Sequence, residues 1–332
     1  MGAERKLKVA VVGTGDWWGY EHARLYHSRS DTELAGILGR SQAKAEARAS
    51  EFGTTGYSDL DALLEAERPD LVSVCLPNEG HFGTTLAIIR AGLPLLVEKP
   101  FVFDLAQADE LLAQAAEREL WFGINFNHRY AKPVQLARAA IGDGDLGPIS
   151  FATWRFGGEV GDSEHPHANL IETQCHGLDM LEHLCGPIDS VMAQMTDPAG
   201  RGYTTLAVAL HFASGAVGSL VGSYDSSYAY PNTHTVEING RDGRVLIEDT
   251  VRRYTFNRVG DETAQVWQAG YFNDRERIFH RLFDRHADAF LAAFRAGEEP
   301  PVHARAGRRA LALAHAIIES FETGRRVSTA ER

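Results

Sequence analysis

Residues 7–19 read LKVAVVGTGDWWG, a short apolar strand followed by a glycine-rich turn. The spacing of Gly13, Gly15 and Gly19 is G-x-G-x-x-x-G, one residue longer than the common dinucleotide fingerprint. Glycines between a strand and a helix let a pyrophosphate approach the backbone amides at the helix N-terminus. The stretch therefore predicts nucleotide binding, and the alternative is a glycine turn without a ligand. The residues expected around the cofactor are Gly13, Thr14, Gly15, Asp16, Trp17 and Trp18.

The first third of the chain alternates apolar strands with helical patterns, which is typical of βαβ units in a parallel sheet. We expect helices after the glycine turn, to about residue 26, and again to residue 52. The expected strands are 7–12, 34–38, 71–76, 95–97 and 121–126. This pattern predicts a dinucleotide-binding domain over residues 1–127 with a doubly wound α/β fold.

After residue 127 the pattern changes to strands in series, separated by turns such as Ser214-Gly215 and Asp242-Gly243 that suit hairpins. The expected strands are 149–156, 189–196, 204–212, 216–224, 233–239 and 244–249, with helices near 133–141, 168–185, 273–296 and 304–323. The pattern predicts a second, α+β domain over residues 128–332 with an open, largely antiparallel sheet. One alternative for the last helix is that it packs back on the first domain.

Composition narrows the class of protein. The 332 residues are 44% hydrophobic and 23% charged, with a formal net charge of -12, which argues against a partner such as nucleic acid or an anionic membrane. Three cysteines cannot all pair, which favours a reducing cytoplasm. No apolar run approaches the roughly 18 residues that span a bilayer. The first residues lead into a strand pattern rather than a signal-peptide core, so we expect a cytoplasmic protein.

The end of the second expected strand bears on the choice of cofactor. An NAD enzyme usually places an acid about 20 residues past the glycine loop, where it binds the ribose hydroxyls. Here the sequence reads Leu38-Gly39-Arg40-Ser41, without an acid. The Arg40 guanidinium suits a 2′-phosphate, so NADP is favoured over NAD. The alternatives are that Arg40 stacks on the adenine or points to solvent.

Glu98-Lys99-Pro100 closes the apolar run 95–97, so Lys99 falls at the carboxyl end of a buried strand. Open parallel sheets bind ligands at this edge. The amine can hydrogen-bond a reacting hydroxyl, and the proline stiffens the turn. The alternative is an ordinary strand-end turn with a solvated lysine.

Together these motifs resemble those of the Gfo/Idh/MocA oxidoreductases, the family of glucose–fructose oxidoreductase and inositol dehydrogenase. The resemblance covers nearly the whole chain and includes His22 beyond the glycine loop, Pro77-Asn78 with His81, Glu98-Lys99-Pro100, Asn127-His128-Arg129-Tyr130 and the segment from Glu172 to Asp179. It implies a Rossmann domain, a second domain with an open sheet, a homodimer or homotetramer built on that sheet, and NAD(P)-dependent oxidation or reduction of a sugar, cyclitol or related polyol.

The resemblance also implies roles for residues. Lys99 would contact the reacting hydroxyl, and Glu98 would lie near the nicotinamide ribose. Leu76, Pro77, Asn78, His81 and Asn127 would line the cofactor. The family's helix motif is Asp-x-x-x-His-x-x-Asp; here Glu172 replaces the first acid and is followed by His176 and Asp179. This departure leaves open whether Glu172 changes specificity.

Residues 172, 176, 179 and 183 share one face of an ideal α-helix and hold acids and histidines in alternation. The stripe is either a solvated face or the wall of a pocket, and Lys99 as a matching partner favours the pocket. His165 and His167 precede this helix, but the proline between them disturbs ligand spacing, so we expect no metal. They would lie in a loop at the substrate mouth or in solvent, and Tyr228 and Tyr230 lie in a second loop that could reach the pocket.

The resulting hypothesis is reversible hydride transfer between nicotinamide and a carbinol carbon. His176 would accept the hydroxyl proton directly or through Lys99, Glu172 and Asp179 would orient His176, and Arg129 and Asn127 would hold cofactor or substrate hydroxyls. Two alternatives remain: an NAD-dependent glycoside hydrolase on the same fold, and a non-catalytic sensor of dinucleotide or sugar. The sequence leaves the individual substrate, the physiological direction and the subunit number open.

Overall fold

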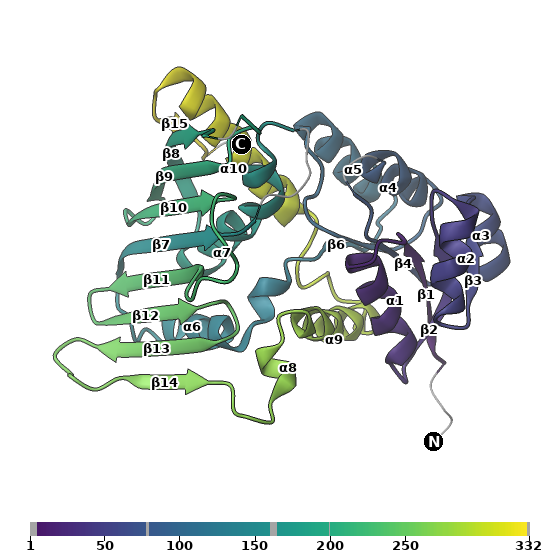
Figure 1. The fold of residues 1–332 in the computed structure, drawn as a ribbon, viewed down its shortest axis with the longest axis horizontal. Helices are drawn as coiled ribbons and strands as arrows, with labels where there is room; N and C mark the ends of the chain where they lie inside the picture. The colour runs from purple at the N-terminus through teal and green to yellow at the C-terminus, as the bar shows by residue number, and fades with distance from the viewer. Residues whose placement is uncertain (1–4, 78–79, 160–164, 199, 331–332) are drawn as a thin grey trace. The chain divides into compact units, whose positions relative to one another are not determined.

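The structure is a computed structural model that describes residues 5–77, 80–159, 165–198 and 200–330 (Figure 1). The chain forms two compact units. One comprises Met1–Asn125 and Ala287–Arg308, and the other comprises Phe126–His286 and Arg309–Arg332. The chain therefore passes from one unit to the other three times.

A six-stranded parallel sheet forms the centre of the first unit, with strand order β3-β2-β1-β4-β5-β6. Its strands are β1 (Leu7–Val12), β2 (Thr32–Leu38), β3 (Thr55–Tyr57), β4 (Leu71–Val74), β5 (Leu95–Val97) and β6 (Phe122–Ile124). The order reverses between β1 and β4, and in doubly wound sheets a dinucleotide binds beside this reversal, at the carboxyl ends of the strands. The loops after β1, β2, β4 and β5 all begin at that edge.

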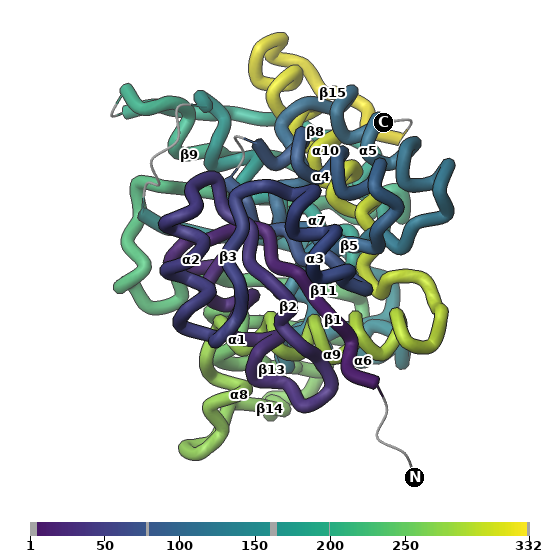
Figure 2. Tube along the Cα trace, turned by 90° about the vertical axis from the view of Figure 1, so that its right-hand side faces the viewer, coloured from purple at the N-terminus to yellow at the C-terminus, as the bar shows by residue number. Residues whose placement is uncertain are grey.

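The helices of this unit connect the parallel strands: α1 (Trp18–Ser28), α2 (Gln42–Ser50), α3 (Leu60–Glu67), α4 (His81–Arg90) and α5 (Leu105–Glu117). Two of them start at aspartate caps: Asp59 accepts a hydrogen bond from the amide of Ala62 at 2.8 Å, and Asp104 accepts one from Gln107 at 3.0 Å. Both views place α2 beside β3, and α4 beside α5 (Figures 1 and 2). Strands β4, β5 and β6 are buried along their whole length, as expected for a sheet covered on both faces.

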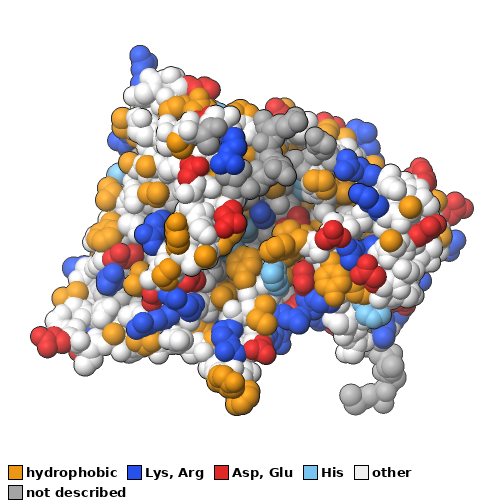
Figure 3. All heavy atoms as spheres, viewed as in Figure 1, with side chains coloured by type: hydrophobic (Ala, Val, Ile, Leu, Met, Phe, Trp, Pro, Cys, Tyr) orange, Lys and Arg blue, Asp and Glu red, His pale blue; other side chains and the backbone are white. Residues whose placement is uncertain are grey.

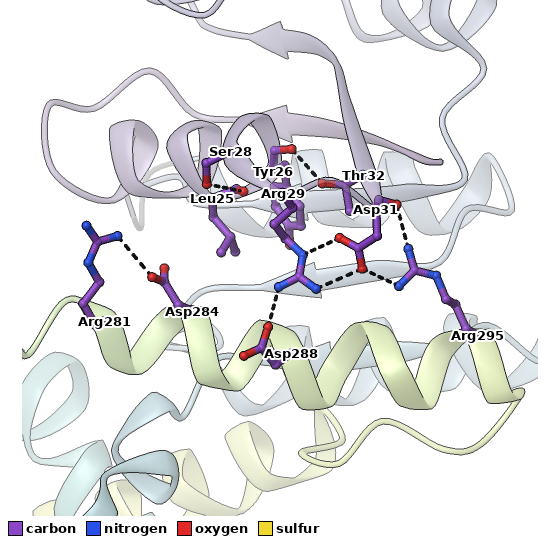
Figure 4. A network of polar contacts seen from close by, with 10 residues as sticks. All are labelled: Leu25, Tyr26, Ser28, Arg29, Asp31, Thr32, Arg281, Asp284, Asp288 and Arg295. Carbon is purple, nitrogen blue, oxygen red and sulfur yellow. Dashed lines mark hydrogen bonds and ion pairs between the residues drawn. The ribbon is translucent and has the colours of Figure 1, made fainter. Parts of the chain in front are cut away.

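Ion pairs and aromatic contacts attach the later segment of the first unit, Ala287–Arg308, to the rest of that unit. Arg29, after α1, donates to Asp31 at 2.8 Å and to Asp288 of α9 (Arg281–Ala296) at 2.5 Å. Arg295 donates to the same Asp31 at 2.7 Å (Figure 4). These hydrogen bonds lower the pKa of Asp31 to about 2, against the opposing effect of partial burial. The cluster ties α9 to the turn before β2.

Aromatic packing completes the attachment of α9 to the sheet edge. The Trp121 ring meets Phe290 edge to face at 4.3 Å between centroids and Phe294 at 5.0 Å. Gly123 in β6 lies directly under Phe290, and a Cβ there would collide with the ring. The glycine is therefore required by the close approach of a helix to the edge strand.

A nine-stranded sheet forms the second unit, in the order β14-β13-β12-β11-β7-β10-β9-β8-β15. Only β7 and β10 pair in parallel; the other neighbours are antiparallel. The strands are β7 (Ile149–Gly157), β8 (Ile188–Thr196), β9 (Thr205–Phe212), β10 (Val217–Ser223), β11 (His234–Gly240), β12 (Gly243–Glu248), β13 (Arg253–Arg258), β14 (Gln265–Gln268) and β15 (Val327–Ser328).

Burial alternates along these strands, which is the sign of a sheet covered on one face. The covering helices include α6 (Lys132–Gly142), next to β12 and β13, and α7 (Cys175–Cys185), next to β7. The remaining helical segments are the 3₁₀ turn η1 (Asn127–Tyr130), the π-helical turn η2 (Asn169–Thr173), α8 (Asp274–Arg277) and α10 (Arg305–Thr323). On the other face, Phe151, Met192, Val217 and Val221 are between 37% and 53% exposed.

Two expected helices differ from the structure. The helix expected over 273–296 is interrupted between α8 and α9, because Ile278 adopts an extended backbone and Phe279 packs on the ring of His128. The helix expected over 168–185 begins as the π-helical turn η2 and becomes α-helical only at Cys175. Strands β3, β13, β14 and β15 were not expected from the sequence.

No helix in the described part of the chain is both long and apolar enough to cross a membrane. On the face seen in Figure 3, acidic and basic side chains are interspersed.

Candidate active site

The glycine loop after β1 has a conformation that only glycine permits at two of its positions. Gly13 has φ +140°, and a Cβ there would lie 2.6 Å from the carbonyl oxygen of Cys75. A Cβ on Gly19 would lie 2.9 Å from the Thr14 backbone. Around Gly15, in contrast, no heavy atom lies within 4 Å of the added Cβ. Two glycines therefore close the loop, while the third keeps its outer side open for a pyrophosphate.

The aspartate of the loop is held by a neighbouring helix. Asp16 accepts a hydrogen bond from Arg48 of α2 at 2.7 Å, and its side chain is otherwise exposed. Arg48 also bonds Glu51 at 2.9 Å and lies over the ring of Tyr20 at 5.4 Å. Trp17 is 60% exposed, and α1 begins at Trp18 without a side-chain cap. This arrangement fixes the loop from the α2 side.

Beyond β2, Gly39 packs against the glycine loop, since a Cβ there would lie 2.6 Å from Cγ2 of Thr14. A larger side chain, including the acid of an NAD site, would therefore displace Thr14. Arg40 and Ser41 are exposed, and Ser41 precedes α2 without capping it. The residues that an anion would meet here are a guanidinium and uncapped helix amides.

The loop after β4 contributes His81, and Asn78 lies outside the described residues. Leu76 is partly buried and Pro77 is exposed. His81, the first residue of α4, is 2% exposed; burial lowers its pKa to about 4, although its backbone hydrogen bond to Pro100 opposes the shift. A neutral imidazole thus connects α4 to the turn after β5.

Glu98 lies inside a buried hydrogen-bond network that ends at the Lys99 turn. The ring of His22 bonds Ser73 Oγ through Nδ1 at 2.8 Å and Glu98 Oε1 through Nε2 at 3.0 Å. Asn125 donates to the same carboxylate oxygen, and the Lys99 amide donates to the other at 3.2 Å. Glu98 is 3% exposed. Its second oxygen therefore helps to fix the backbone of Lys99, a half-buried residue whose peptide bond to Pro100 is cis.

The tautomer of His22 follows from its neighbours. Tyr26 donates its hydroxyl proton to Ser73 Oγ at 3.2 Å, so Ser73 can donate its own proton to Nδ1 of His22. Nε2 then carries the ring proton and donates it to Glu98. This assignment gives the Tyr26–Ser73, Ser73–His22 and His22–Glu98 bonds one donor and one acceptor each.

In the second unit, the turn η2 is fixed by amide side chains. Asn169 donates to the carbonyl oxygen of Thr204 at 2.7 Å and accepts from Gln174 at 3.0 Å. Gln174 in turn accepts from the indole of Trp154 in β7 at 3.0 Å. The extra residue of a π-turn shifts Glu172 away from the ideal α-helical stripe assumed for residues 172–183. Glu172 is half-buried beside Thr173, whose hydroxyl lies 2.5 Å from that of Tyr224.

Two further members of the stripe are buried rather than solvated: His176 is 7% exposed and Asp179 is 6% exposed, while His183 is half-buried. Arg129 of η1 forms a two-pronged ion pair with Asp179, with Nε to Oδ2 at 2.8 Å and a second, shorter bond from Nη2. Burial raises the pKa of Asp179, and Arg129 opposes the shift. Burial also lowers the pKa of His183 to about 4. The guanidinium of Arg129 is thus engaged by protein, and the neighbouring Asn127 is 1% exposed.

The ring of His176 lies in an aromatic cluster. It stacks on His128 of η1, with centroids 3.9 Å apart and planes inclined by 9°. Phe126 meets it edge to face at 6.0 Å. The sequence contained His128 within a motif, but nothing in the spacing indicated a stack.

The next residues are those that the sequence predicts in two loops near the pocket. His167 stacks on Tyr203 at 4.9 Å, and His165 Nδ1 accepts a bond from the His167 amide at 3.2 Å. Tyr228 and Tyr230 are more than half exposed. Within the described ranges, no three His, Cys, Asp or Glu side chains are placed to hold a metal ion.

Comparison with known proteins follows the same division of the chain. A model of an oxidoreductase family with an NAD-binding Rossmann fold matches residues 7–126, and its C-terminal alpha/beta domain matches residues 138–329. The chain belongs to the Gfo/Idh/MocA oxidoreductase family. The predictions of this family, of its two-part α/β fold and of an NAD(P)-dependent oxidoreductase are confirmed.

Individual relatives are dehydrogenases of sugars and cyclitols, in agreement with the expected class of substrate. An inositol 2-dehydrogenase from Rhizobium meliloti is 25% identical over 98% of this chain and 99% of its own. A D-glucoside 3-dehydrogenase from Escherichia coli is 35% identical, over 45% of this chain and 43% of its own. A levoglucosan dehydrogenase in complex with NADH and levoglucosan has the same fold, with a TM-score of 0.86, 19% identity and coverage of 98% and 100%.

Proposed function

We propose that the protein transfers hydride reversibly between a nicotinamide cofactor and a secondary alcohol carbon of a sugar, cyclitol or related polyol. The observation that carries this proposal is the position of Lys99. It follows β5 at the carboxyl edge of the parallel sheet, and its backbone is fixed by the buried carboxylate of Glu98. A lysine held at that edge can hydrogen-bond a substrate hydroxyl beside the cofactor.

The residues of the first unit fit a dinucleotide. The open side of Gly15 and the uncapped start of α1 would hold the pyrophosphate, with Thr14, Trp17 and Trp18 beside it. When bound, the nicotinamide supplies or takes up the hydride. Leu76, Pro77, Asn78 and Asn127 stay in the proposed cofactor set. His81 and Glu98 would act through the Lys99 turn, because their polar groups are directed to that turn.

The proton would move through Lys99 and His176. In oxidation, His176 accepts the hydroxyl proton directly or through Lys99, and in reduction the same pair returns it. Asp179, paired with Arg129, would orient the helix that carries His176. Glu172 would accept hydrogen bonds from substrate hydroxyls, with the Thr173–Tyr224 pair beside it.

Separate Lys99→Ala and His176→Ala variants test these roles. Each should lose roughly 10²–10⁴-fold in kcat and retain the affinity for cofactor, measured by quenching of tryptophan fluorescence. Matched controls are Lys132→Ala, a half-buried lysine in the second unit, and His183→Ala, a half-buried histidine of α7. Unchanged turnover in both test variants would reject the proposed roles.

Substrates are found by incubating sugars and cyclitols with NAD and NADP in parallel and following absorbance of the reduced nicotinamide. Net reduction of cofactor by a polyol supports the proposal. Glycoside cleavage without net redox change, with retained cofactor, would identify an NAD-dependent hydrolase instead. Binding of dinucleotide without turnover of any polyol or sugar would identify a sensor.

We also propose that NADP is preferred over NAD. Support comes from the exposed Arg40 and Ser41 before the uncapped start of α2, and from Gly39, where a larger side chain would have to displace the methyl group of Thr14. Arg40→Ala should lower kcat/KM for NADP roughly tenfold to a hundredfold and leave that for NAD nearly unchanged. Arg90→Ala removes an equally exposed arginine and is the control. Equal effects on both cofactors would refute the preference.

We further propose a cytoplasmic homo-oligomer, dimer or tetramer, that pairs through the outer face of the nine-stranded sheet. The exposed Phe151, Met192 and Val217 on that face support it, and the three buried cysteines, none of them in a disulfide, suit a reducing compartment. Met192→Glu should shift the sedimentation coefficient toward that of a monomer. A wild-type protein that sediments as a monomer would reject the assembly.

A further inference from the structure

We propose that His128 is a positioning residue that fixes the ring plane of His176 and favours its protonated form by offering a neutral aromatic face. This inference rests on the proposed function, because it gives His176 the proton-transfer role. The observation behind it is the stacked pair itself: centroids 3.9 Å apart and ring planes within 9°, with one ring from η1 and the other from α7.

His128 is itself immobilised. It is 2% exposed and is surrounded by rings from three further segments: Trp154 of β7 at 6.3 Å, His234 of β11 at 5.8 Å and Phe279 before α9 at 5.1 Å. Phe279 and His234 both meet it edge to face. A ring enclosed in this way cannot rotate without moving a strand or helix, so it provides a fixed platform for His176.

The surroundings of the pair decide where a proton can reside. Two imidazolium rings at this separation would repel each other strongly, so at most one ring of the pair is protonated to the cation. Behind His128, burial lowers the pKa of His234 to about 3, so that ring is neutral. Among the described residues, the charged groups that neighbour the pair along the chain are Arg129, Asp179 and Glu172, and Arg129 and Asp179 neutralise each other. The proposed function adds the ammonium of Lys99.

Burial disfavours charge on both rings. We place the added proton on His176, because the proposed function gives proton transfer to that ring. The imidazolium of His176 then lies over a neutral π face, an arrangement that stabilises a cation. In oxidation this favours the state in which His176 has taken the substrate proton. The stack therefore acts on both the orientation and the proton affinity of the proposed base.

Two variants separate the aromatic face from the volume it fills. His128→Phe keeps a flat ring that cannot ionise, and His128→Leu keeps bulk without a π face. We expect His128→Phe to retain kcat within about threefold. His128→Leu should lower kcat roughly tenfold or more while leaving KM for cofactor unchanged, since a misplaced base affects chemistry and not nucleotide binding.

The decisive measurement is the NMR titration of the His176 ring in the protein without substrate, assigned with a His176→Gln spectrum. His128→Leu should lower the measured pKa of His176 by about half to one unit relative to wild type, and His128→Phe should leave it equal or higher. The acidic limb of the pH profile of kcat/KM should move in the same direction. Identical titrations of His176 in all three proteins would overturn the proposal.

His286→Leu is the matched control. His286 is another fully buried ring of the second unit, but it packs on Tyr130 at 4.9 Å and Phe283 at 6.5 Å rather than on His176. An equal fall in kcat in this control would show that loss of packing alone explains the effect, and would also overturn the proposal. A full shift in the titration of His176, together with normal turnover of His176→Ala, would leave the stack intact and refute only the proposed function.

Discussion

The two units immobilise histidines in opposite ways. In the first unit, His22 is fixed by hydrogen bonds through both ring nitrogens, to Ser73 and to Glu98. In the second, His128 and His176 are fixed by their ring faces, with Trp154, Phe279 and Phe126 around them. One site is a polar network in a sheet interior and the other is an aromatic stack.

The two arrangements constrain a histidine ring in different ways. A ring that is hydrogen-bonded at both nitrogens has a fixed orientation. Through its bond to Glu98, His22 also helps to fix the backbone of Lys99. A ring fixed by its faces is oriented by packing. We therefore infer that the first histidine serves structure, and that the stack orients the ring to which the proposed function gives proton transfer.

The largest effect is expected when the polar network is broken. His22→Phe would leave Ser73 and Glu98 without their ring partner in a buried site, so we expect a loss of about 3–4 kcal/mol in the free energy of unfolding. Scanning calorimetry or urea unfolding measures it. His27→Phe, an exposed histidine of the same helix, should change stability by less than about 0.5 kcal/mol. Comparable losses in both would show that the network is not what holds this site.

Removing the ion pair of the second unit comes next. Arg129→Gln leaves the buried carboxyl of Asp179 without its counter-ion, at a cost of about 3 kcal/mol near pH 8. Burial already raises the pKa of Asp179 above 3.8, and loss of Arg129 raises it further. The folded state then binds more protons than the unfolded state between those pKa values, so stability falls as the pH rises through them.

Urea unfolding of Arg129→Gln at pH 5 and pH 8 tests the sign, with the larger penalty expected at pH 8. Adding Asp179→Asn to this variant removes the titrating group and should abolish the difference between the two pH values. A penalty that is larger at pH 5 would contradict the assignment of a buried, uncompensated carboxyl.

Ring packing also carries stability in the first unit, at the edge where Phe290 covers Gly123. Gly123→Ala forces the ring or helix α9 to shift, and we expect a loss of about 1–3 kcal/mol, measured by calorimetry. Gly83→Ala is the control, because its added Cβ meets nothing within 4 Å and lies within α4. That variant should be neutral or up to about 1 kcal/mol more stable.

The smallest effect on stability is expected from replacing His128 by phenylalanine, the same change as in His22→Phe but within the stacked pair. His128→Phe keeps a flat ring of similar size in the stack, so its free energy of unfolding should change by less than about 1 kcal/mol. Calorimetry beside His22→Phe gives the comparison directly. A loss as large as that of His22→Phe would mean that hydrogen bonds, and not ring faces, hold His128.

Much of the fold could be predicted, because its signals are local. The apolar runs ending at Val12, Val74 and Val97 indicate buried parallel strands, and the glycines after Val12 indicate a loop that only they can form. The positions of Lys99 and Arg40 follow from the strand ends that precede them. The short strands β3 and β15 gave no comparable signal, since three and two residues carry too little periodicity.

The candidate site was less accessible to sequence. That Glu98 and His81 line the cofactor stays a prediction; the structure adds that a Glu98 oxygen accepts a hydrogen bond from the Lys99 amide. Arg129 was expected to hold hydroxyls, and it is paired with Asp179. The Arg129–Asp179 pair joins residues that are 50 positions apart in the chain, and no spacing rule reports such pairs.

By itself, the sequence determined the family, the strand-edge position of Lys99 and the absence of an acid beside the expected ribose site, because these depend on short motifs and their order. The contact of Phe279 with His128, at the break in a predicted helix, is visible only in the three-dimensional structure. The same holds for the stacking of His128 on His176. Side-chain packing of this kind depends on contacts between segments that are distant in the chain. No single stretch of sequence therefore specifies it.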